Sequence, residues 1–249
     1  MDSLETDIDL SRHTPVCIVI PTYNEADNIP QLVSRIDSLG ISDLVLLLVD
    51  DNSPDGTADL ADLIGKDFEI TVRVLRRSAK AGLGTAYIEG FHWALDRDFN
   101  TIIQMDADLS HPPECITKML KLLDVYQVVV ASRYINSGSV DKNWNWTRKL
   151  LSRVGNYGVR KIAGLKISDA TSGFKAYRKS TLALIDFDLT KCKGFGFQCE
   201  IAYICQVMGF KIFELPIVFP DRQFGSSKMS PGIIAEAIVK IIRIQAKFP

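Results

Sequence analysis

Four short apolar runs, separated by longer segments with a helical pattern, constrain the fold of this chain more than any other feature. Each run has five or six residues rich in Val, Ile and Leu: VCIVI (16–20), LVLLLV (44–49), TIIQM (101–105) and QVVVAS (127–132). Continuous apolar runs of this length are typical of strands buried on both faces of a parallel sheet. A fifth run, ITVRVL (70–75), alternates more and predicts a half-exposed strand.

The segments between these runs have the pattern of helices. They cover residues 28–39, 56–65, 85–97 and 113–124, and several open with Asp, Ser or Thr or with Pro near the first turn. Strands that alternate with helices in this way predict an α/β fold with a mostly parallel central sheet flanked by helices. After residue 134 the pattern loosens, and further helices are expected at 147–162 and 198–208.

Length and composition are consistent with one domain. The 249 residues are 47% hydrophobic, which suffices for one large core, so we expect a single domain over residues 1–249. The net charge of −1 creates no general field that attracts nucleic acid, and we expect no nucleic-acid partner. Five cysteines are scattered without a CxxC pair, which favours a reducing compartment such as the cytoplasm.

The two ends of the chain bear on membrane association. Residues 1–14 are acidic and polar, unlike a signal peptide, and we expect a flexible tail there. Residues 231–249 place isoleucines at helical spacing and carry only basic charges after Glu236, which predicts an amphipathic helix. Such a helix binds a membrane surface, docks on a membrane subunit or packs on its own core, and the sequence leaves all three open. The apolar runs are far shorter than the roughly 20 residues of a membrane-spanning helix.

Polar residues follow each of the four apolar runs. The runs lead into Pro21–Glu25 (PTYNE), Asp50–Gly56 (DDNSPDG), Asp106–Asp108 (DAD) and Arg133. In an open parallel sheet the ligand lies at the carboxyl ends of the strands. If the four strands are parallel, these polar clusters meet at one edge and predict a ligand site there.

Asp106 and Asp108 are the strongest candidates for a metal site. Two carboxylates two residues apart on an extended segment face the same side and together hold one hard cation, Mg²⁺ or Mn²⁺. Such an ion bridges a diphosphate and neutralises the charge that develops on it as a leaving group. The competing interpretation is that these acids only cap the helix that follows.

A diphosphate also needs cations, and three residues are candidates. These are Arg133, Arg222 and Lys228. Arg222 and Lys228 lie in DRQFGSSK, a Gly- and Ser-rich stretch typical of a loop that closes over an anion.

The first two strand ends offer groups for the rest of a nucleotide. Asp50 or Asp51 is placed to accept hydrogen bonds from ribose or base, Tyr23 offers a stacking face, and Glu25 is a further acceptor. Turn and cap roles are the alternative for both aspartates. The glycines of KAGLG (80–84) favour close helix packing over a phosphate cradle, because the third glycine of a dinucleotide motif is missing.

Taken in order, the motifs PTYNE, DDNSPDGT, KAGLGTA, DADLSHPP, SRY, SGFKAYRK and DRQFGSSK resemble the dolichol (polyprenol) phosphate mannose synthases, inverting family 2 glycosyltransferases with a GT-A fold. The likeness runs from about residue 16 to about residue 245. It implies a GT-A, Rossmann-like fold and a hexosyltransferase that moves mannose from GDP-mannose to the phosphate of a polyprenyl or dolichyl lipid. It also implies a Mg²⁺ or Mn²⁺ cofactor and a place at the cytoplasmic face of a membrane, with a small membrane subunit as a possible partner.

The resemblance assigns roles to individual residues. Those around the nucleotide sugar are Pro21, Tyr23, Glu25, Val49, Asp51, Asp106, Ala107, Asp108, Arg133, Arg222 and Lys228. Those nearest the metal are Asp106, Asp108 and Ser110, and those at the acceptor phosphate are Arg148 and Ser152. Asp108 and Arg133 are expected to carry the chemistry. Relatives usually have Gln at the position of Ser110, which leaves room for a water between Ser110 and the ion. They usually have Gly at Asn52, and Asn tolerates the positive φ of such a turn.

Other functions remain open from the sequence alone. A polyprenyl-phosphate glucosyltransferase that uses UDP-glucose fits the same motifs. A phosphatase of the haloacid dehalogenase type also uses an apolar strand followed by DxD, but there the DxD normally follows an early strand. A receiver-like Mg²⁺-binding signalling module clusters acids and a lysine in a similar way, but it needs only about half this length and leaves DRQFGSSK unexplained.

Overall fold

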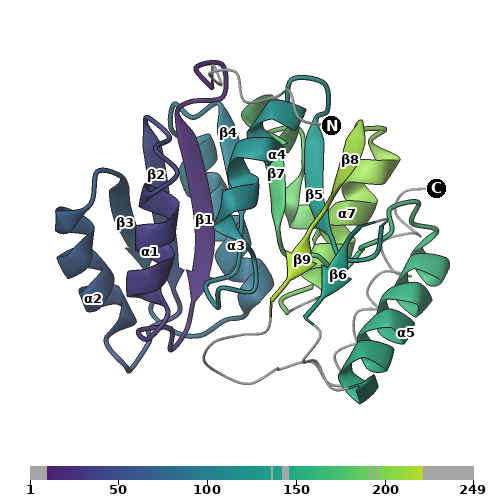
Figure 1. The fold of residues 1–249 in the computed structure, drawn as a ribbon, viewed down its shortest axis with the longest axis horizontal. Helices are drawn as coiled ribbons and strands as arrows, with labels where there is room; N and C mark the ends of the chain where they lie inside the picture. Colours follow the sequence, from purple (N-terminus) through teal and green to yellow (C-terminus); the bar gives the residue numbers. More distant parts are fainter. Residues whose placement is uncertain (1–9, 136, 142–145, 191, 195, 221–249) are drawn as a thin grey trace.

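The chain folds as an α/β structure around a seven-stranded sheet (Figure 1). The structure is a computed structural model that describes residues 10–135, 137–141, 146–190, 192–194 and 196–220. In chain order the sheet strands are β1 (Val16–Thr22), β2 (Leu44–Asp50), β3 (Thr71–Arg76), β4 (Thr101–Gln104), β5 (Val128–Ser132), β7 (Lys175–Arg178) and β8 (Ile212–Pro216). Their order across the sheet is β3-β2-β1-β4-β7-β5-β8, and two short strands, β6 (Ser139–Val140) and β9 (Val218–Phe219), form a separate pair.

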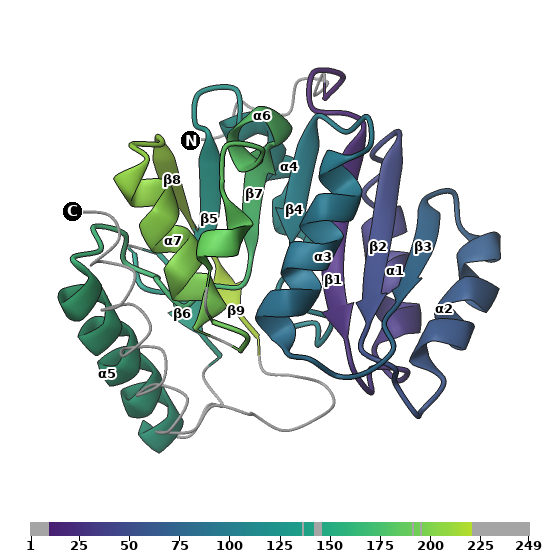
Figure 2. The ribbon, with the colours of Figure 1, turned by 180° about the vertical axis from the view of Figure 1, so that it is seen from behind.

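Helices cover both faces of the sheet. They are α1 (Ile29–Asp37), α2 (Thr57–Ile64), α3 (Leu83–Leu95), α4 (Ile116–Leu122), α5 (Trp146–Ala163), α6 (Lys179–Leu182) and α7 (Phe197–Val207). Figure 1 shows α1 and α4 on one face, and Figure 2 shows α3, α6 and α7 on the other. Each face has its own apolar core, because buried strands present side chains to both sides. The predicted mostly parallel, helix-flanked α/β fold is confirmed.

All five predicted strands are confirmed as β1 to β5, but two strands of the sheet were not predicted. β7 lies between β4 and β5 and is antiparallel to both, so it separates two strands that the alternating pattern places side by side. Its sequence, KAYR, has no apolar run because it begins with Lys175 and ends with Arg178, although Lys175 is buried in the core. β8 completes the sheet next to β5.

The predicted helices agree with the structure except near the prolines. Residues 113–124, predicted as one helix, form a short 3₁₀ turn (Pro113–Cys115) followed by α4. Close packing explains the small residues of α3: a Cβ on Gly90 would collide with Val19 of β1. In the predicted N-terminal tail, residues 10–14 form a turn in which Leu10 packs on the core and His13 is buried. Residues 1–9 and the predicted helix at 231–249 lie outside the described residues.

The carboxyl ends of β1, β2, β4 and β5 lie at the same edge of the sheet. β1 pairs in parallel with both β2 and β4. β4 and β5 both run antiparallel to β7, so they point the same way as each other. The strand-end clusters that the sequence singled out are therefore brought to one edge, as predicted.

Candidate active site

Asp106 lies two residues after the end of β4 and is held by two side chains, Tyr87 and His111. Its Oδ1 accepts a hydrogen bond of 2.8 Å from the Tyr87 hydroxyl on α3, and its backbone N–H donates to Nδ1 of His111 at 3.0 Å. The carboxylate remains 24% exposed. Tyr87 stays protonated because burial, and then the neighbouring Asp106 charge, raises the pKa of the phenol. Asp106 is therefore fixed in direction while one side stays open.

Asp108 is more deeply buried, and Ser110 supports it. Oδ1 of Asp108 accepts hydrogen bonds from the backbone N–H of Ser110, at 3.1 Å, and from its hydroxyl. Leu109, between them, has a φ of 60°, so the chain turns sharply behind the carboxylate. In this structure the hydroxyl of Ser110, predicted near the metal, orients Asp108.

Gly173 packs closely against the side chains of Asp106 and His111. A Cβ on Gly173 would stand 3.1 Å from Oδ2 of Asp106 and 3.2 Å from the ring of His111. A larger residue at position 173 would therefore press on Asp106 and His111 and require them to shift by a few tenths of an ångström. His111 stacks on Phe174, and burial lowers its pKa, so it is neutral and accepts a hydrogen bond at Nδ1.

The two carboxylates fit a divalent cation that also needs ligands from a substrate. Among the described residues, no group of three or more His, Cys, Asp or Glu side chains is placed to hold a metal ion alone. Mg²⁺ and similar ions are commonly held by one or two carboxylates together with phosphate oxygens of the substrate. Asp106 and Asp108 match that pattern.

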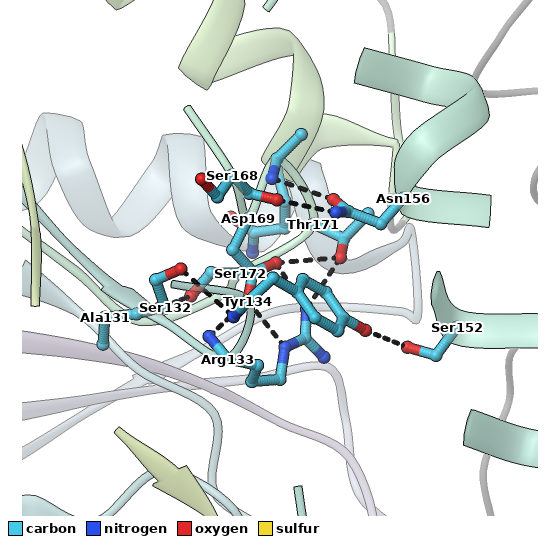
Figure 3. A network of polar contacts seen from close by, with 12 residues as sticks. Ala131, Ser132, Arg133, Tyr134, Ser152, Asn156, Ser168, Asp169, Thr171 and Ser172 are labelled. Carbon is cyan, nitrogen blue, oxygen red and sulfur yellow. Dashed lines mark hydrogen bonds and ion pairs between the residues drawn. The ribbon is translucent and has the colours of Figure 1, made fainter. Parts of the chain in front are cut away.

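Arg133 is held by a buried aspartate that sequence reasoning missed. Its Nε and Nη2 each donate to a carboxylate oxygen of Asp169 at 2.7 Å, and Nη2 also donates to Thr171 at 2.7 Å (Figure 3). Burial by itself lowers the pKa of Arg133 and raises that of Asp169. The ion pair between them outweighs burial, so the pKa of Arg133 is raised and that of Asp169 is lowered. Both groups are therefore ionised, and the guanidinium is held in one orientation.

Two backbone N–H groups hold the segment that carries Asp169. Those of Ser168 and Asp169 donate to the Glu214 carboxylate on β8, at 2.7 and 3.0 Å. Within the described part of the chain no hydrogen bond uses Nη1 of Arg133. The phosphate contact predicted for Arg133 stays a prediction.

α5 is tied to the same region at two points. The hydroxyl of Ser152, a predicted acceptor-phosphate contact, lies 2.6 Å from the hydroxyl of Tyr134. One turn further, the side-chain amide of Asn156 donates to the carbonyl of Ser168 and accepts from the N–H of Ala170 (Figure 3). These two residues flank Asp169, so α5 is linked to the segment that orients Arg133.

Of the two aspartates at the end of β2, Asp50 has a structural role. It accepts hydrogen bonds from the Thr22 hydroxyl at 3.0 Å and from the N–H and hydroxyl of Ser53. It therefore shapes the turn, in which Asn52 has the predicted positive φ of 59°.

Asp51 pairs instead with Arg77, a residue that sequence reasoning missed. Nη1 of Arg77 donates to Oδ1 of Asp51, while its other donors reach Glu89 at 2.8 Å and Thr85 at 2.9 Å. Asp51 and Arg77 are both nearly buried. The carboxylate predicted beside the nucleoside is thus held by a cation from the end of the neighbouring strand.

The remaining predicted nucleotide residues lie along the same edge. Pro21 pairs in register with Val49 on the neighbouring strand. The ammonium of Lys80 lies 3.5 Å from the centre of the Tyr23 ring. Glu25 accepts a hydrogen bond of 2.7 Å from Asn28. Ala107, between the two metal-site aspartates, is buried, as is Val49.

The KAGLG segment packs against backbone, as expected. A Cβ on Gly82 or Gly84 would meet the carbonyls of Lys193 or Cys192, and the N–H of Gly84 donates to the carbonyl of Lys193 at 2.7 Å. The buried Glu200 in turn accepts from the N–H of Cys192 at 2.8 Å. Three predicted contacts cannot be placed: Arg222 and Lys228 lie outside the described residues, as does the side chain of Arg148.

Comparison with known sequences identifies the family. Residues 17–184 match the family described as glycosyl transferase family 2. The chain is 42% identical over 229 residues to an undecaprenyl-phosphate mannosyltransferase of Micrococcus luteus, covering 92% of this chain and 93% of the relative. It is 40% identical over 225 residues to a polyprenol monophosphomannose synthase of Mycolicibacterium smegmatis, covering 90% and 84%. The resemblance to polyprenol phosphate mannose synthases is therefore confirmed, and the receiver-like and dehalogenase alternatives are removed.

Comparison with solved structures supports the fold. Glucosyl-3-phosphoglycerate synthase from Mycobacterium tuberculosis, solved with Mn²⁺, UDP and glucosyl-3-phosphoglycerate, superposes with a TM-score of 0.63 at 16% identity, covering 93% of this chain and 78% of that one. The same enzyme with Mn²⁺ and UDP-glucose gives 0.63 at 17% identity, with the same coverage. The predicted GT-A fold is confirmed, and the chain belongs to glycosyl transferase family 2.

Proposed function

We propose that this protein transfers mannose from GDP-mannose to the phosphate of a polyprenyl lipid, with inversion at the anomeric carbon. The observation that carries the proposal is the meeting of Asp106, Asp108 and Arg133 at one sheet edge, in a chain 40% and 42% identical to two mannosyltransferases that act on polyprenyl phosphates. Two carboxylates for a metal and one oriented guanidinium suit a reaction between two phosphate-bearing substrates.

The acceptor itself supplies the nucleophile. A phosphate monoester has a second pKa near 6 and is largely dianionic at neutral pH, so its oxygen attacks without a side-chain base. The C–O bond between sugar and diphosphate breaks as the new one forms. The protein mainly has to orient the two substrates and stabilise charge on the leaving diphosphate.

Asp106 and Asp108 would hold the metal, Mg²⁺ or Mn²⁺, which supplies positive charge to the leaving diphosphate. The bonds from Tyr87 and Ser110 keep both carboxylates in place before any ligand arrives. Arg133 is held in the same way by Asp169. Groups that need no reorganisation stabilise a developing charge more effectively than mobile ones.

The composition of the outer face of α5 supports the proposal that the acceptor is a lipid in a membrane. The helix contains five Lys or Arg and no Asp or Glu. Its exposed apolar side chains include Trp146 (71%), Leu150 (53%), Val154 (58%) and Tyr157 (60%). Apolar and basic residues on one helix favour an anionic lipid surface. Among the described residues, no helix combines the length and hydropathy that a membrane crossing requires.

The test is a panel of nucleotide sugars with one lipid acceptor. The purified chain is incubated with Mn²⁺, a short polyprenyl phosphate and GDP-mannose, UDP-glucose or GDP-glucose, and the lipid-linked sugar is identified by mass spectrometry. We expect product from GDP-mannose alone. Product from UDP-glucose alone would instead support the glucosyltransferase alternative, and product from none of the three would reject the proposal.

A further inference from the structure

Tyr134 is a polar side chain beside Arg133 that the proposed mechanism leaves without a role. It follows Arg133 in the chain, just after β5, and its hydroxyl lies 2.6 Å from Oγ of Ser152 on α5. Figure 3 shows the tyrosine ring reaching from the strand end toward the helix. Both side chains are partly exposed, so neither belongs to the closed core.

The hydroxyls of Tyr134 and Ser152 have one donor proton more than the hydrogen bond between them uses. Each hydroxyl carries one proton, and a single hydrogen bond between Tyr134 and Ser152 consumes one of the two. Within the described residues, the second proton has no acceptor. Burial raises the pKa of Tyr134, against the opposing charge of Arg133, so the phenol is a donor at neutral pH.

The surroundings of the pair suit a phosphate. The guanidinium carbon of Arg133 lies 5.1 Å from the centre of the Tyr134 ring. A phosphate monoester presents three unesterified oxygens and needs several donors at once. A neutral hydroxyl pair next to an oriented guanidinium offers donors without adding negative charge, as an anionic ligand requires.

We propose that the hydroxyl of Tyr134 binds the acceptor phosphate together with Ser152, so that the bond between the two hydroxyls is exchanged for bonds to phosphate oxygens. The proposal rests on the proposed function, from which the Ser152 contact is taken. It adds a second donor on the strand side of the acceptor. A purely structural pair would only fasten α5 to the end of β5.

The experiment removes one oxygen atom. In Tyr134→Phe we expect the KM for polyprenyl phosphate to rise about tenfold, since a hydrogen bond to a charged group is lost. The KM for GDP-mannose and the melting temperature should stay as in the wild type. Tyr126→Phe is the matched control, because Tyr126 is a partly exposed tyrosine at the opposite end of β5 from Tyr134 and loses the same atom.

Two further measurements separate a role in acceptor binding from a purely structural role. Ser152→Ala should raise the same KM, and the double variant should cost less than the product of the two single effects, since both hydroxyls serve one phosphate. Titration calorimetry with the lipid phosphate, GDP and Mn²⁺ measures binding without turnover. Weaker binding in Tyr134→Phe supports the proposal even if the wild type transfers no mannose, a result that would count against the proposed function alone. A lower melting temperature with unchanged acceptor binding would overturn it, because the pair would then be only a tether.

Discussion

The two ends of the candidate site are built differently. On the donor side, at the ends of β1, β2 and β4, each aspartate is already bonded to neighbours: Asp51 to Arg77, Asp106 to Tyr87 and Asp108 to Ser110. On the acceptor side, α5 presents an outer face of exposed apolar side chains. Under the proposed function, the first arrangement suits a small charged donor and the second an extended lipid surface.

This difference follows from the substrates that the proposed reaction joins. A diphosphate and its metal demand carboxylates and cations in fixed places, because misplacement weakens every electrostatic contact. A lipid is bound through the apolar surface that it covers, and a contiguous exposed apolar surface on a protein marks an interaction site. Arg133 stands between the two, held by Asp169 and linked through Asn156 to α5.

Replacing Asp108 should give the largest effect and tests whether the donor side is a metal site. We expect Asp108→Ala to lower kcat by about 1000-fold or more, because the ion that stabilises the leaving diphosphate loses one of its two carboxylates. Mannosyl transfer and Mn²⁺ binding, the latter by electron paramagnetic resonance, are both measured. Asp98→Ala removes an exposed acid from the turn between α3 and β4 and should change neither. Full activity of Asp108→Ala would show that the metal is held elsewhere.

Asp169 should come next, because it acts through Arg133. In Asp169→Asn one charged partner becomes a neutral amide, and we expect kcat/KM to fall about 100-fold as the guanidinium loses its orientation. The variant should also be less stable, since removing one partner of a buried ion pair lowers the free energy of unfolding by about 3–5 kcal/mol. Activity is therefore compared at a temperature where the variant is folded. Thr171→Val removes a neutral hydroxyl that accepts from Arg133 and donates to Asp169 at 3.2 Å, and it should cost about fivefold in kcat/KM with a smaller loss of stability in urea than Asp169→Asn. If both variants kept wild-type kcat/KM while folded, the pair would be structural only.

Sequence reasoning correctly placed the polar clusters at one edge of the sheet, because the signals for this are local. Each apolar run of β1, β2, β4 and β5 is followed directly by its polar cluster, and parallel strands bring such clusters together whatever the rest of the fold does. The interpretation of Asp106 and Asp108 needed only their spacing on an extended segment.

The residues that sequence reasoning missed act across long separations. Tyr87 reaches Asp106 from α3, and Asp169 reaches Arg133 from a segment that reads as a loop. Nothing in their own neighbourhoods distinguishes them from surface or turn residues. β7 was missed for a related reason: a buried lysine breaks the apolar pattern, and its partner Gln198 lies on α7. Such pairings become visible only when the sheet order is known.

Two acids introduced on the exposed face of α5 test the acceptor side, with a smaller expected effect. Leu150→Glu with Val154→Glu places two acids on the exposed face of a basic helix, and we expect about a tenfold loss of binding to vesicles with anionic lipid. Binding is measured by cosedimentation, and the KM for a short, dispersed acceptor should stay unchanged. Leu63→Glu with Leu184→Glu alters equally exposed leucines elsewhere and serves as control. Equal losses in both variants would show that α5 is not a specific membrane contact.

The smallest expected effect concerns Lys175, on the strand that joins the two sides. Its ammonium is buried and donates to the carbonyl of Ser172 and, at 3.0 Å, to Oε1 of Gln198. Burial lowers the pKa of Lys175 from 10.5 to about 8, against the opposing influence of Cys199, Cys205, Asp169 and Asp106.

This shift has a definite sign in the pH dependence of stability. Below pH 8 the lysine is charged in both states, and the folded state bears the full cost of a buried charge. Between pH 8 and the unfolded value of 10.5 the unfolded state binds more protons, so the free energy of unfolding rises with pH. The gain is at most about 1.4 kcal/mol per pH unit. Compared with Lys175→Met, which lacks this proton, the wild type should therefore gain stability from pH 8 to pH 10 in urea titrations. Parallel curves for the two proteins would show that Lys175 keeps an ordinary pKa, and that the junction between donor and acceptor sides is better hydrated than its burial implies.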